Sequence, residues 1–275
     1  SVACIAANSI NVWNNKFLSN GFANFNSGGG IQITGANHNI YGNNFTNNNV
    51  FGIDNNADNT VIANNKIKGN LPANNAYPWS GVRMIDVSGG VIQGNDIQKH
   101  DVGIKLTGSN GVSINGNTLA NNIVDIYIDP SNNNQIINNL ITSATSGIQI
   151  DNSTGNLVRR NTISENTFGI ILKESNGNFI YDNYFMRNSF NAQDRDGSNY
   201  WNTTKQPGQN ILGGNIIGGN FWFDYKGQDS NNDGVGDTDL PYNSGNRIRN
   251  GGDYIPLYKT FVTGGPSSGP GQHKR

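Results

Sequence analysis

The sequence predicts an all-β protein folded as a parallel β-helix solenoid with coils of about 22 residues. Three observations predict it: a short phrase centred on asparagine recurs along the chain, a second apolar phrase keeps the same spacing, and no segment between them has helical periodicity. Strands this short cannot bury apolar surface alone. Stacked coil on coil, they form ladders of like side chains about 4.8 Å apart around one continuous core.

The first phrase is an aliphatic residue, two free positions, an asparagine, one free position and a large apolar residue. Five of the seven steps between its asparagines are 22 residues, and the other two are 28 and 30. The extra residues fall in 18–29 and 71–78, where a solenoid takes insertions as loops. The asparagines are Asn15, Asn43, Asn65, Asn95, Asn117, Asn139, Asn161 and Asn183.

An inward asparagine is compatible with such a fold if it lies at a corner of the coil. Asparagine tolerates the left-handed backbone conformation, and its amide can bond the equivalent amide one coil away. We therefore expect these asparagines to be structural and to have no role in chemistry.

The second phrase is a small residue followed by an apolar, a free and an apolar position, as in Gly103-Ile104-Lys105-Leu106 and Gly147-Ile148-Gln149-Ile150. Its alternation predicts a half-buried strand in every coil. Aligning residues 1–4 with this phrase places Cys4 in the inward column, where a small buried hydrophobe is expected.

Composition excludes several classes of function. The formal net charge is −1 with a sequence pI near 6.3, so no basic surface for nucleic acid is expected. The sequence has no apolar run of 18 residues that could span a membrane. A single cysteine rules out an intrachain disulfide and any metal site built from several cysteines.

Three regions follow from where the pattern changes. Coils are expected over residues 1–195, because continuing the spacing puts Asp194 where an inward leucine should stand. Residues 196–262 are expected to form a cap, and residues 263–275 have the composition of a flexible tail. Aromatic residues expected to seal the last coil are Trp201, Phe221, Trp222, Phe223 and Tyr225.

The cap contains a candidate calcium loop over residues 229–239. Oxygen ligands at positions 1, 3 and 5, a glycine at 6, a backbone carbonyl at 7 and a carboxylate at 9 match the first part of an EF-hand loop. Leu240 stands where that loop has its bidentate acid, so Asp239, Asp224 or Asp253 would have to complete the shell. The predicted Ca²⁺ ligands are Asp229, Asn231, Asp233, the Val235 carbonyl, Asp237 and Asp239; the alternative is an ordinary Asp/Asn/Gly turn.

The repeats and the cap together resemble the NosD-like and CASH (carbohydrate-binding and sugar-hydrolase) β-helix families, in particular archaeal and bacterial surface proteins. The resemblance covers about residues 10–257, and its most specific part is the closing phrase Gly219-Asn220-Phe221-Trp222-Phe223-Asp224-Tyr225. It implies a right-handed helix in a secreted or envelope protein and fixes no activity. One family role is copper processing, which we do not expect here, because the three histidines, two methionines and one cysteine are scattered.

An enzyme would need acids and bases on one outward face. The spacing places Arg83, Lys105 and Tyr127 in one outward column and Asp129 and Asp151 in a neighbouring one. Such a group could support cleavage of a polysaccharide by a hydrolase or a lyase. The alternative is that both aspartates begin turns and bond their own backbone.

Three sequons, at Asn44, Asn152 and Asn202, suit a secreted chain, and Asn44 should point outward because it follows an inward asparagine. The leading interpretation is a secreted, calcium-stabilised β-helix that serves as a structural component of a cell surface, envelope or extracellular fibre. The alternative is a carbohydrate-binding or carbohydrate-cleaving module. Because residue 1 aligns with the start of a coil, self-association through an open first coil, residues 1–15, is also expected.

Overall fold

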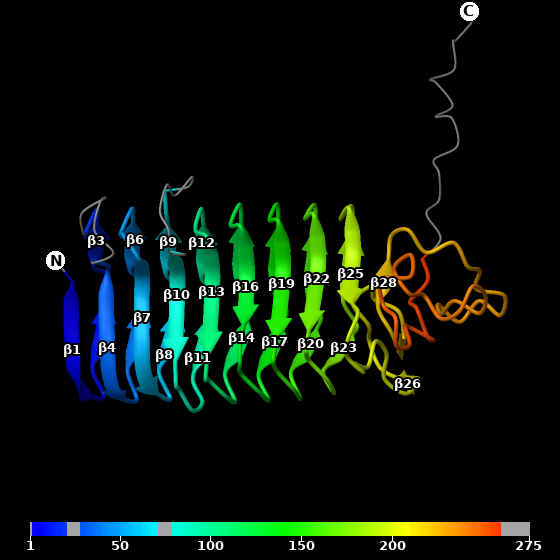
Figure 1. Cartoon of the computed structure of the whole chain (residues 1–275), viewed down its shortest axis with the longest axis horizontal. Coiled ribbons are helices and arrows are strands. Elements are labelled where there is room, and N and C mark those ends of the chain that lie inside the picture. Colours follow the sequence, from blue (N-terminus) through cyan, green and yellow to red (C-terminus); the bar gives the residue numbers. More distant parts are fainter. Residues whose placement is uncertain (1, 21–27, 71–78, 260–275) are drawn as a thin grey trace, which may run out of the picture.

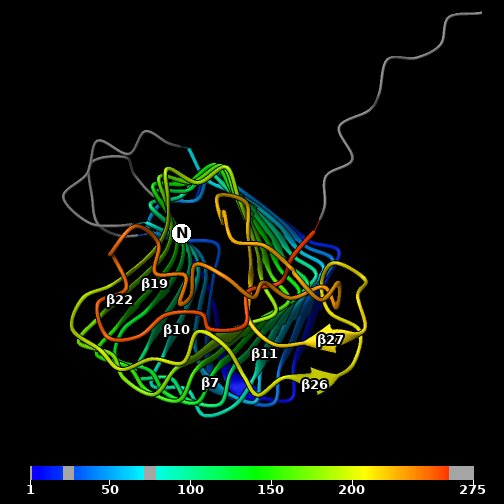
Figure 2. The same ribbon diagram turned by 90° about the vertical axis from the view of Figure 1, so that its right-hand side faces the viewer.

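The computed structural model describes residues 2–20, 28–70 and 79–259, and in these residues every regular element is a β-strand. The strands stack along the long axis, with β1 at one end and the cap at the other (Figure 1). Viewed along that axis, successive coils lie over one another around a common centre (Figure 2). The predicted parallel β-solenoid is confirmed.

Three parallel sheets form the solenoid, and each of the first eight coils contributes one strand to each sheet. Sheet 1 has the order β1 (Ala3–Asn8), β4 (Ile31–Ala36), β7 (Phe51–Asp58), β10 (Ser80–Ile85), β13 (Val102–Thr107), β16 (Val124–Ile128), β19 (Ser146–Asp151), β22 (Phe168–Lys173) and β25 (Phe190–Asp194).

Sheet 2 contains β2 (Asn11–Trp13), β5 (Asn39–Tyr41), β8 (Val61–Ala63), β11 (Val91–Gln93), β14 (Ser113–Asn115), β17 (Gln135–Ile137), β20 (Leu157–Arg159) and β23 (Phe179–Tyr181). Sheet 3 contains β3 (Lys16–Leu18), β6 (Asn44–Thr46), β9 (Lys66–Lys68), β12 (Asp96–Gln98), β15 (Thr118–Ala120), β18 (Leu140–Thr142), β21 (Thr162–Ser164), β24 (Tyr184–Met186) and β28 (Phe221–Trp222). A small antiparallel pair, β26 (Gln206–Pro207) and β27 (Ile216–Ile217), lies in the cap.

The core consists of columns of aliphatic side chains, one from each strand position that faces inward. In the coil that begins at β13, Ile104, Leu106, Ile114 and Leu119 are all fully buried. Each lies in register with a buried residue one coil on, as Ile104 does with Ile126. Because every coil repeats the pattern, the core is continuous from one end to the other.

The predicted asparagine column is confirmed, and it lies at the corner between sheets 2 and 3. Asn139 is typical: its Nδ2 donates to Asn161 Oδ1 at 2.9 Å and to the carbonyl of Ile114 at 2.9 Å, and its Oδ1 accepts the backbone N–H of Asn117. The column continues across both long steps, since Asn15 bonds Asn43 and Asn65 bonds Asn95. The centres of the two insertions, residues 21–27 and 71–78, and the predicted tail 263–275 lie outside the described residues.

The structural reason expected for these asparagines was partly wrong. The left-handed residue at this corner is the one before the column, for example Asn138 with φ 57° and Gly116 with φ 64°. The column asparagine instead supplies the amide that bonds the buried backbone groups of the corner. The left-handed conformation and the amide bonds therefore come from two adjacent residues.

The other two corners have columns that the sequence pattern did not reveal. Between sheets 3 and 1, Asn20 bonds Asn48 and Asn166 bonds Asn188 in the same way. Between sheets 1 and 2, Ser109 donates its backbone N–H to Ser131 Oγ at 2.9 Å. Polar side chains thus pair the backbone at all three corners.

The expected inward position of Cys4 was wrong. Cys4 is exposed, because it is in register with the outward Gln32, while Ala3 and Ile5 pair with the inward Ile31 and Ile33. The turn after the first strand is one residue shorter in the first coils than in the later coils from which the alignment was taken.

The cap closes the solenoid through a ninth column asparagine, Asn220. Its Oδ1 accepts from Asn183 Nδ2 at 2.9 Å, and its own backbone N–H donates to the buried Asp253 at 2.7 Å. Trp222 stacks on Phe185 with ring centres 4.4 Å apart and donates its indole N–H to Asp253. No described helix has the length and apolarity to cross a membrane.

Replacing Asn139 by leucine should lower the free energy of unfolding by about 1 to 3 kcal/mol, because the change leaves buried donors and acceptors of two neighbouring coils without partners. Urea unfolding checks this. Asn115→Leu is the matched control, since Asn115 faces outward and its neighbour in register is already Ile137. A neutral Asn139→Leu variant would contradict a stabilising role for the column.

The stability should fall as the pH rises from about 6.5 to 8.5. Burial raises the pKa of Asp253 to about 7 and that of Asp125 to about 8, so the folded state holds these protons more tightly than the unfolded state does. Burial lowers the pKa of His100 to about 4. This histidine makes the stability rise with pH, but only below its ordinary pKa of 6.5. Melting curves recorded across this pH range should show that the stability of Asp253→Asn declines less steeply with pH than that of the parent protein. An equal slope in both proteins would contradict this.

Candidate functional site

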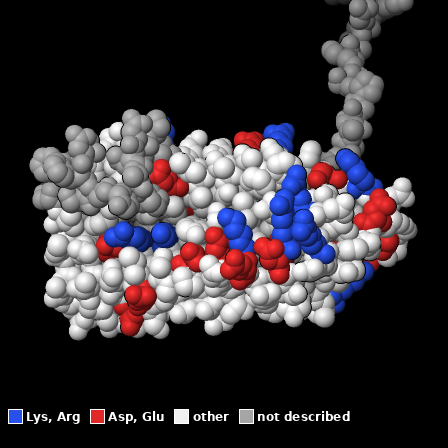
Figure 3. Space-filling model, viewed as in Figure 1, with Lys and Arg blue, Asp and Glu red and all other residues white. Residues whose placement is uncertain are grey.

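The outer face of sheet 1 carries the predicted outward column. Strand register places Gln32, Asp54, Arg83, Lys105, Tyr127 and Gln149 in line, one from each successive coil. Charged side chains of both signs gather in a band across this face (Figure 3). The solenoid therefore presents a polar track that runs parallel to its axis.

The centre of this track is a cluster around the Tyr127 hydroxyl. That hydroxyl lies 3.0 Å from Asp129 Oδ2 and 3.2 Å from Asp151 Oδ2, so the structure brings together the two predicted aspartates and the predicted tyrosine. Gln149 Nε2 donates to Asp151 Oδ2 at 2.7 Å, and Asn152 Nδ2 donates to Asp129 Oδ1 at 3.0 Å. Burial and the two carboxylates raise the pKa of Tyr127 well above its usual range, so the hydroxyl keeps its proton.

Asp151 differs from its neighbours in the cluster. It is 8% exposed, and its Oδ1 is buried with no hydrogen-bond donor from the described protein. A buried carboxylate oxygen without a donor is uncommon in proteins, because burying an acceptor without a hydrogen bond is costly. The expected alternative, in which Asp151 bonds only its own turn, is therefore not the arrangement found.

The two predicted basic residues lie along the same track. Lys105 Nζ lies 5.7 Å from the centre of the Tyr127 ring, a cation–π distance. Arg83 forms two hydrogen bonds of 2.8 Å with the buried Asp54 and lies over the ring of Phe51. The charge of Arg83 is thus already paired, while Lys105 lies next to the cluster.

The candidate calcium loop forms a network of turns in the structure. Asp229 accepts the backbone N–H groups of Asp233 and Gly234 at 3.1 and 2.8 Å, and Asp237 accepts that of Ser230 at 2.7 Å. The ammonium group of Lys205 bonds Asp233 and lowers the pKa of that carboxyl.

In the described part of the chain no three His, Cys, Asp or Glu side chains are placed to hold a metal ion. Asn231 points its amide at Asp237, at 3.4 Å, and Val235 is buried beside Leu257. Asp239 has a left-handed backbone with φ 52°. Calcium binding stays a prediction, and it requires Lys205 to leave Asp233.

The three sequon asparagines differ in accessibility. Asn152 is exposed, and Asn44 is half-buried and faces outward on β6, as expected, with its Oδ1 accepting from Thr46 at 2.7 Å. Asn202 uses both ends of its amide: Oδ1 accepts the backbone N–H of Tyr254, and Nδ2 donates to the Thr203 carbonyl. Glycosylation of any of them stays a prediction.

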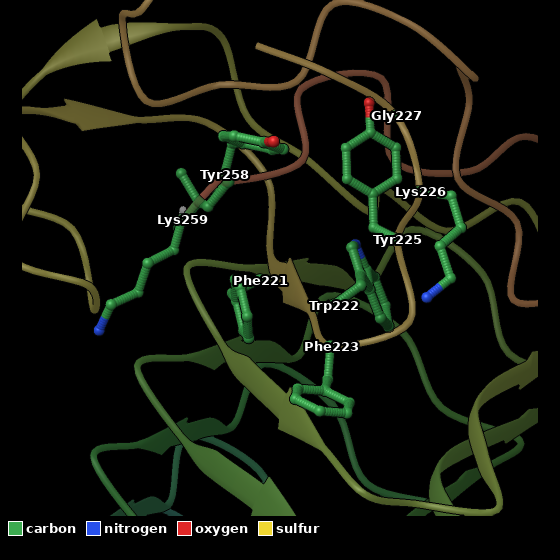
Figure 4. Close-up of a pocket in the computed structure, with 9 residues that line it drawn as sticks. Phe221, Trp222, Phe223, Tyr225, Lys226, Gly227, Tyr258 and Lys259 are labelled. Atoms are coloured by element: carbon green, nitrogen blue, oxygen red, sulfur yellow. The ribbon is translucent and has the colours of Figure 1, made fainter. Parts of the chain in front are cut away.

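A groove in the cap is lined by part of the predicted aromatic cluster. Figure 4 shows Phe221, Trp222 and Phe223 on one side of it, with Tyr225 and Tyr258 across from them. Its volume is about 500 Å³. Phe223 is 46% exposed, so it does not help to seal the last coil, whereas Trp201, Phe221 and Trp222 are buried.

Comparison with known proteins identifies the family. Residues 13–227 match the family described as "Periplasmic copper-binding protein (NosD)". The chain belongs to the NosD family. No curated protein sequence matches it.

Solved structures similar to this NosD-family chain share little sequence identity with it. A variant of the periplasmic alginate epimerase AlgG matches with a TM-score of 0.56 and 20% identity over 70% of this chain, and the chain spans about half (51%) of the length of that epimerase. The enzymatically active domain of the bacteriophage CBA120 tailspike protein 2 matches with a TM-score of 0.49 and 13% identity, covering 70% of this chain and 37% of that one. DFA-IIIase from Arthrobacter chlorophenolicus A6 matches with a TM-score of 0.47 and 14% identity, covering 70% and 56%.

The NosD family description names copper, but the described residues do not form a suitable set of copper ligands. Copper prefers imidazole, thioether and thiolate ligands. His38 is buried, with Nδ1 accepting the backbone N–H of Ile10 and Nε2 lying 3.2 Å from the Thr34 carbonyl. His100 and Met84 are buried, and Cys4 is exposed in the first strand. These side chains do not converge.

Calcium should raise the melting temperature if the loop over residues 229–239 binds it, since a ligand present at 100 times its Kd stabilises by about 2.7 kcal/mol. Differential scanning calorimetry in calcium and in chelator checks this, with Asp229→Asn as the variant that loses the effect. Lys205→Met should strengthen the effect because it removes the competing ammonium. Identical melting curves in calcium and chelator, for both the parent protein and Lys205→Met, would show that the segment is only a turn.

Proposed function

We propose that this chain is an extracytoplasmic β-helix that binds a polysaccharide on the outer face of sheet 1, around Tyr127, Asp129 and Asp151. The observation that carries the proposal is the Tyr127 hydroxyl shared by Asp129 and Asp151, which gathers one donor and two carboxylates on the outer face of sheet 1. A sugar hydroxyl can donate a hydrogen bond to the partly exposed carboxylate of Asp129 and accept one from the amides of Gln149 and Asn152 beside it.

The shape of the track also favours a long ligand. Its polar groups recur once per coil, so donors and acceptors follow one another along the solenoid axis at about 4.8 Å. A polymer of hydroxyl-bearing units can contact several of them at once, from Arg83 to Gln149. Many weak contacts of this kind add up in one chain, as in other multivalent interactions.

The cluster supports binding better than cleavage. The raised pKa of Tyr127 keeps its proton in place between two carboxylates, so it is a poor base. Arg83 is held by Asp54 and does not lie free to neutralise an acidic sugar. We therefore propose recognition, with the solenoid acting as a rigid structural support in the envelope or outside the cell.

The structural role of the leading interpretation is part of this proposal. A core that is continuous along the stack and a cap that is bonded to the last coil make a rod suited to display a binding face. Self-association through residues 1–15 stays a prediction.

Binding is tested with a panel of immobilised plant, algal and bacterial polysaccharides. Asp151→Asn and Tyr127→Phe should each weaken binding about tenfold or more, because a hydrogen bond to a charged group contributes about 1.5 to 3 kcal/mol. Asp96→Asn, which changes a carboxylate on sheet 3, is the matched control and should bind like the parent.

The same incubations are assayed for reducing and unsaturated sugar ends. If the parent protein produces new sugar ends and Asp151→Asn does not, the function is catalysis and not binding alone. A protein that binds no member of the panel, or whose Asp96→Asn variant loses as much affinity as Asp151→Asn, would overturn the proposal and leave the scaffold role alone.

A further inference from the structure

A second groove lies in the cap, where the chain leaves sheet 2. Its volume is about 360 Å³, and its lining includes Tyr200, Trp201, Asn202, Asn250 and Tyr254. Two segments form it, residues 198–202 and residues 250–254. None of its lining side chains is charged. It shares no residue with the polar track on sheet 1.

Two tyrosine rings border this groove and are unusually exposed. Tyr200 is 55% exposed and Tyr254 is 56% exposed, whereas Trp201 between them is buried. Large aromatic side chains normally bury most of their surface. Tyr200 stacks on Phe179 with ring centres 4.8 Å apart and an interplanar angle of 17°, so its ring is held in place although it faces solvent.

The second tyrosine is held by an asparagine. Asn202 Oδ1 accepts the backbone N–H of Tyr254 at 3.1 Å and so ties the two segments of the groove together. Asn250, which also lines the groove, donates its Nδ2 to the Gly197 carbonyl at 3.0 Å. Gly251 has open space where a Cβ would stand, so the backbone here leaves room for a ligand.

The aromatic surface continues away from the groove along sheet 2. Leu157, Phe179 and Tyr200 follow one another in register on the outer face. Beside them run the polar Asn132, Thr154, Asn176 and Ser198, of which Ser198 donates its backbone N–H to Asn176 Oδ1 at 2.9 Å. An apolar strip next to an amide strip suits a ligand with an apolar face and polar edges.

From this geometry we infer that the Tyr200–Tyr254 groove binds a neutral saccharide. Sugar rings present C–H faces that pack on aromatic rings, and their hydroxyl groups bond amides and backbone carbonyls. The uncharged lining gives no partner for a carboxylate or sulfate group, so the ligand is a neutral sugar and not an acidic one. The site goes beyond the polysaccharide face proposed above, because it uses other residues on another sheet.

The test titrates the full chain with neutral hexasaccharides of β-1,4-linked glucose and of β-1,4-linked mannose, and with hexagalacturonate as the acidic counterpart, by isothermal titration calorimetry. At least one neutral sugar should bind, and hexagalacturonate should not bind in this groove. Tyr200→Ala and Tyr254→Ala should each weaken the neutral sugar about tenfold, the effect expected from losing one aromatic contact of roughly 1.4 kcal/mol.

Four controls make the outcome decisive. Tyr41→Ala removes an exposed ring from a different outward column near the other end of sheet 2 and should bind like the parent. Asp96→Asn leaves both proposed faces intact and should bind like the parent. Asp151→Asn is titrated beside it, so that failure of the sheet 1 proposal does not resemble failure of this one. Unchanged melting temperatures in the tyrosine variants show that they fold.

Several results would overturn the inference. One is the absence of any heat of binding with either neutral sugar. Another is an equal loss of affinity in Tyr41→Ala and Tyr254→Ala. A third is a preference for hexagalacturonate that depends on Tyr254. If Asp151→Asn loses binding and Tyr254→Ala does not, the neutral sugar binds on sheet 1 instead.

Discussion

Hydrogen-bond satisfaction at the corners is the constraint on which the rest of this structure depends. A coil of three short strands turns sharply three times, and each turn would leave buried backbone groups without partners. The asparagine column meets this need between sheets 2 and 3: Asn139 alone bonds the coil before it and the coil after it. With the corners paired, Ile104 and its equivalents can stack into a dry core.

This constraint explains what could be predicted from the sequence. Residues that repeat in every coil leave a periodic signal, so the asparagine column, the inward aliphatic residues and the outward order Arg83, Lys105 and Tyr127 were all predicted. Asn220 was missed because it follows Asn183 by 37 residues. Its phrase, an asparagine, one residue and a large aromatic, is nevertheless the one that Asn183 shows.

Contacts made once in the molecule leave no such signal. The period placed Tyr127, Asp129 and Asp151 on one face, but the sharing of one hydroxyl between two carboxylates depends on side-chain conformation. Lys205 reaches Asp233 from another part of the cap, and no spacing rule connects them. The Cys4 register was wrong for a related reason, because a one-residue difference in a single turn reverses the face that a strand presents.

The asparagine column also has a direction. From Asn15 to Asn183 each side-chain amide donates one N–H to the next asparagine of the column toward the C-terminal end, over distances of 2.9 to 3.3 Å. Aligned amides add their dipoles and polarise one another, as peptide groups do in an α-helix. The column therefore presents the N–H ends of its amides to the cap, where Asn220 accepts the last of these bonds and donates its own backbone N–H to the buried carboxyl of Asp253.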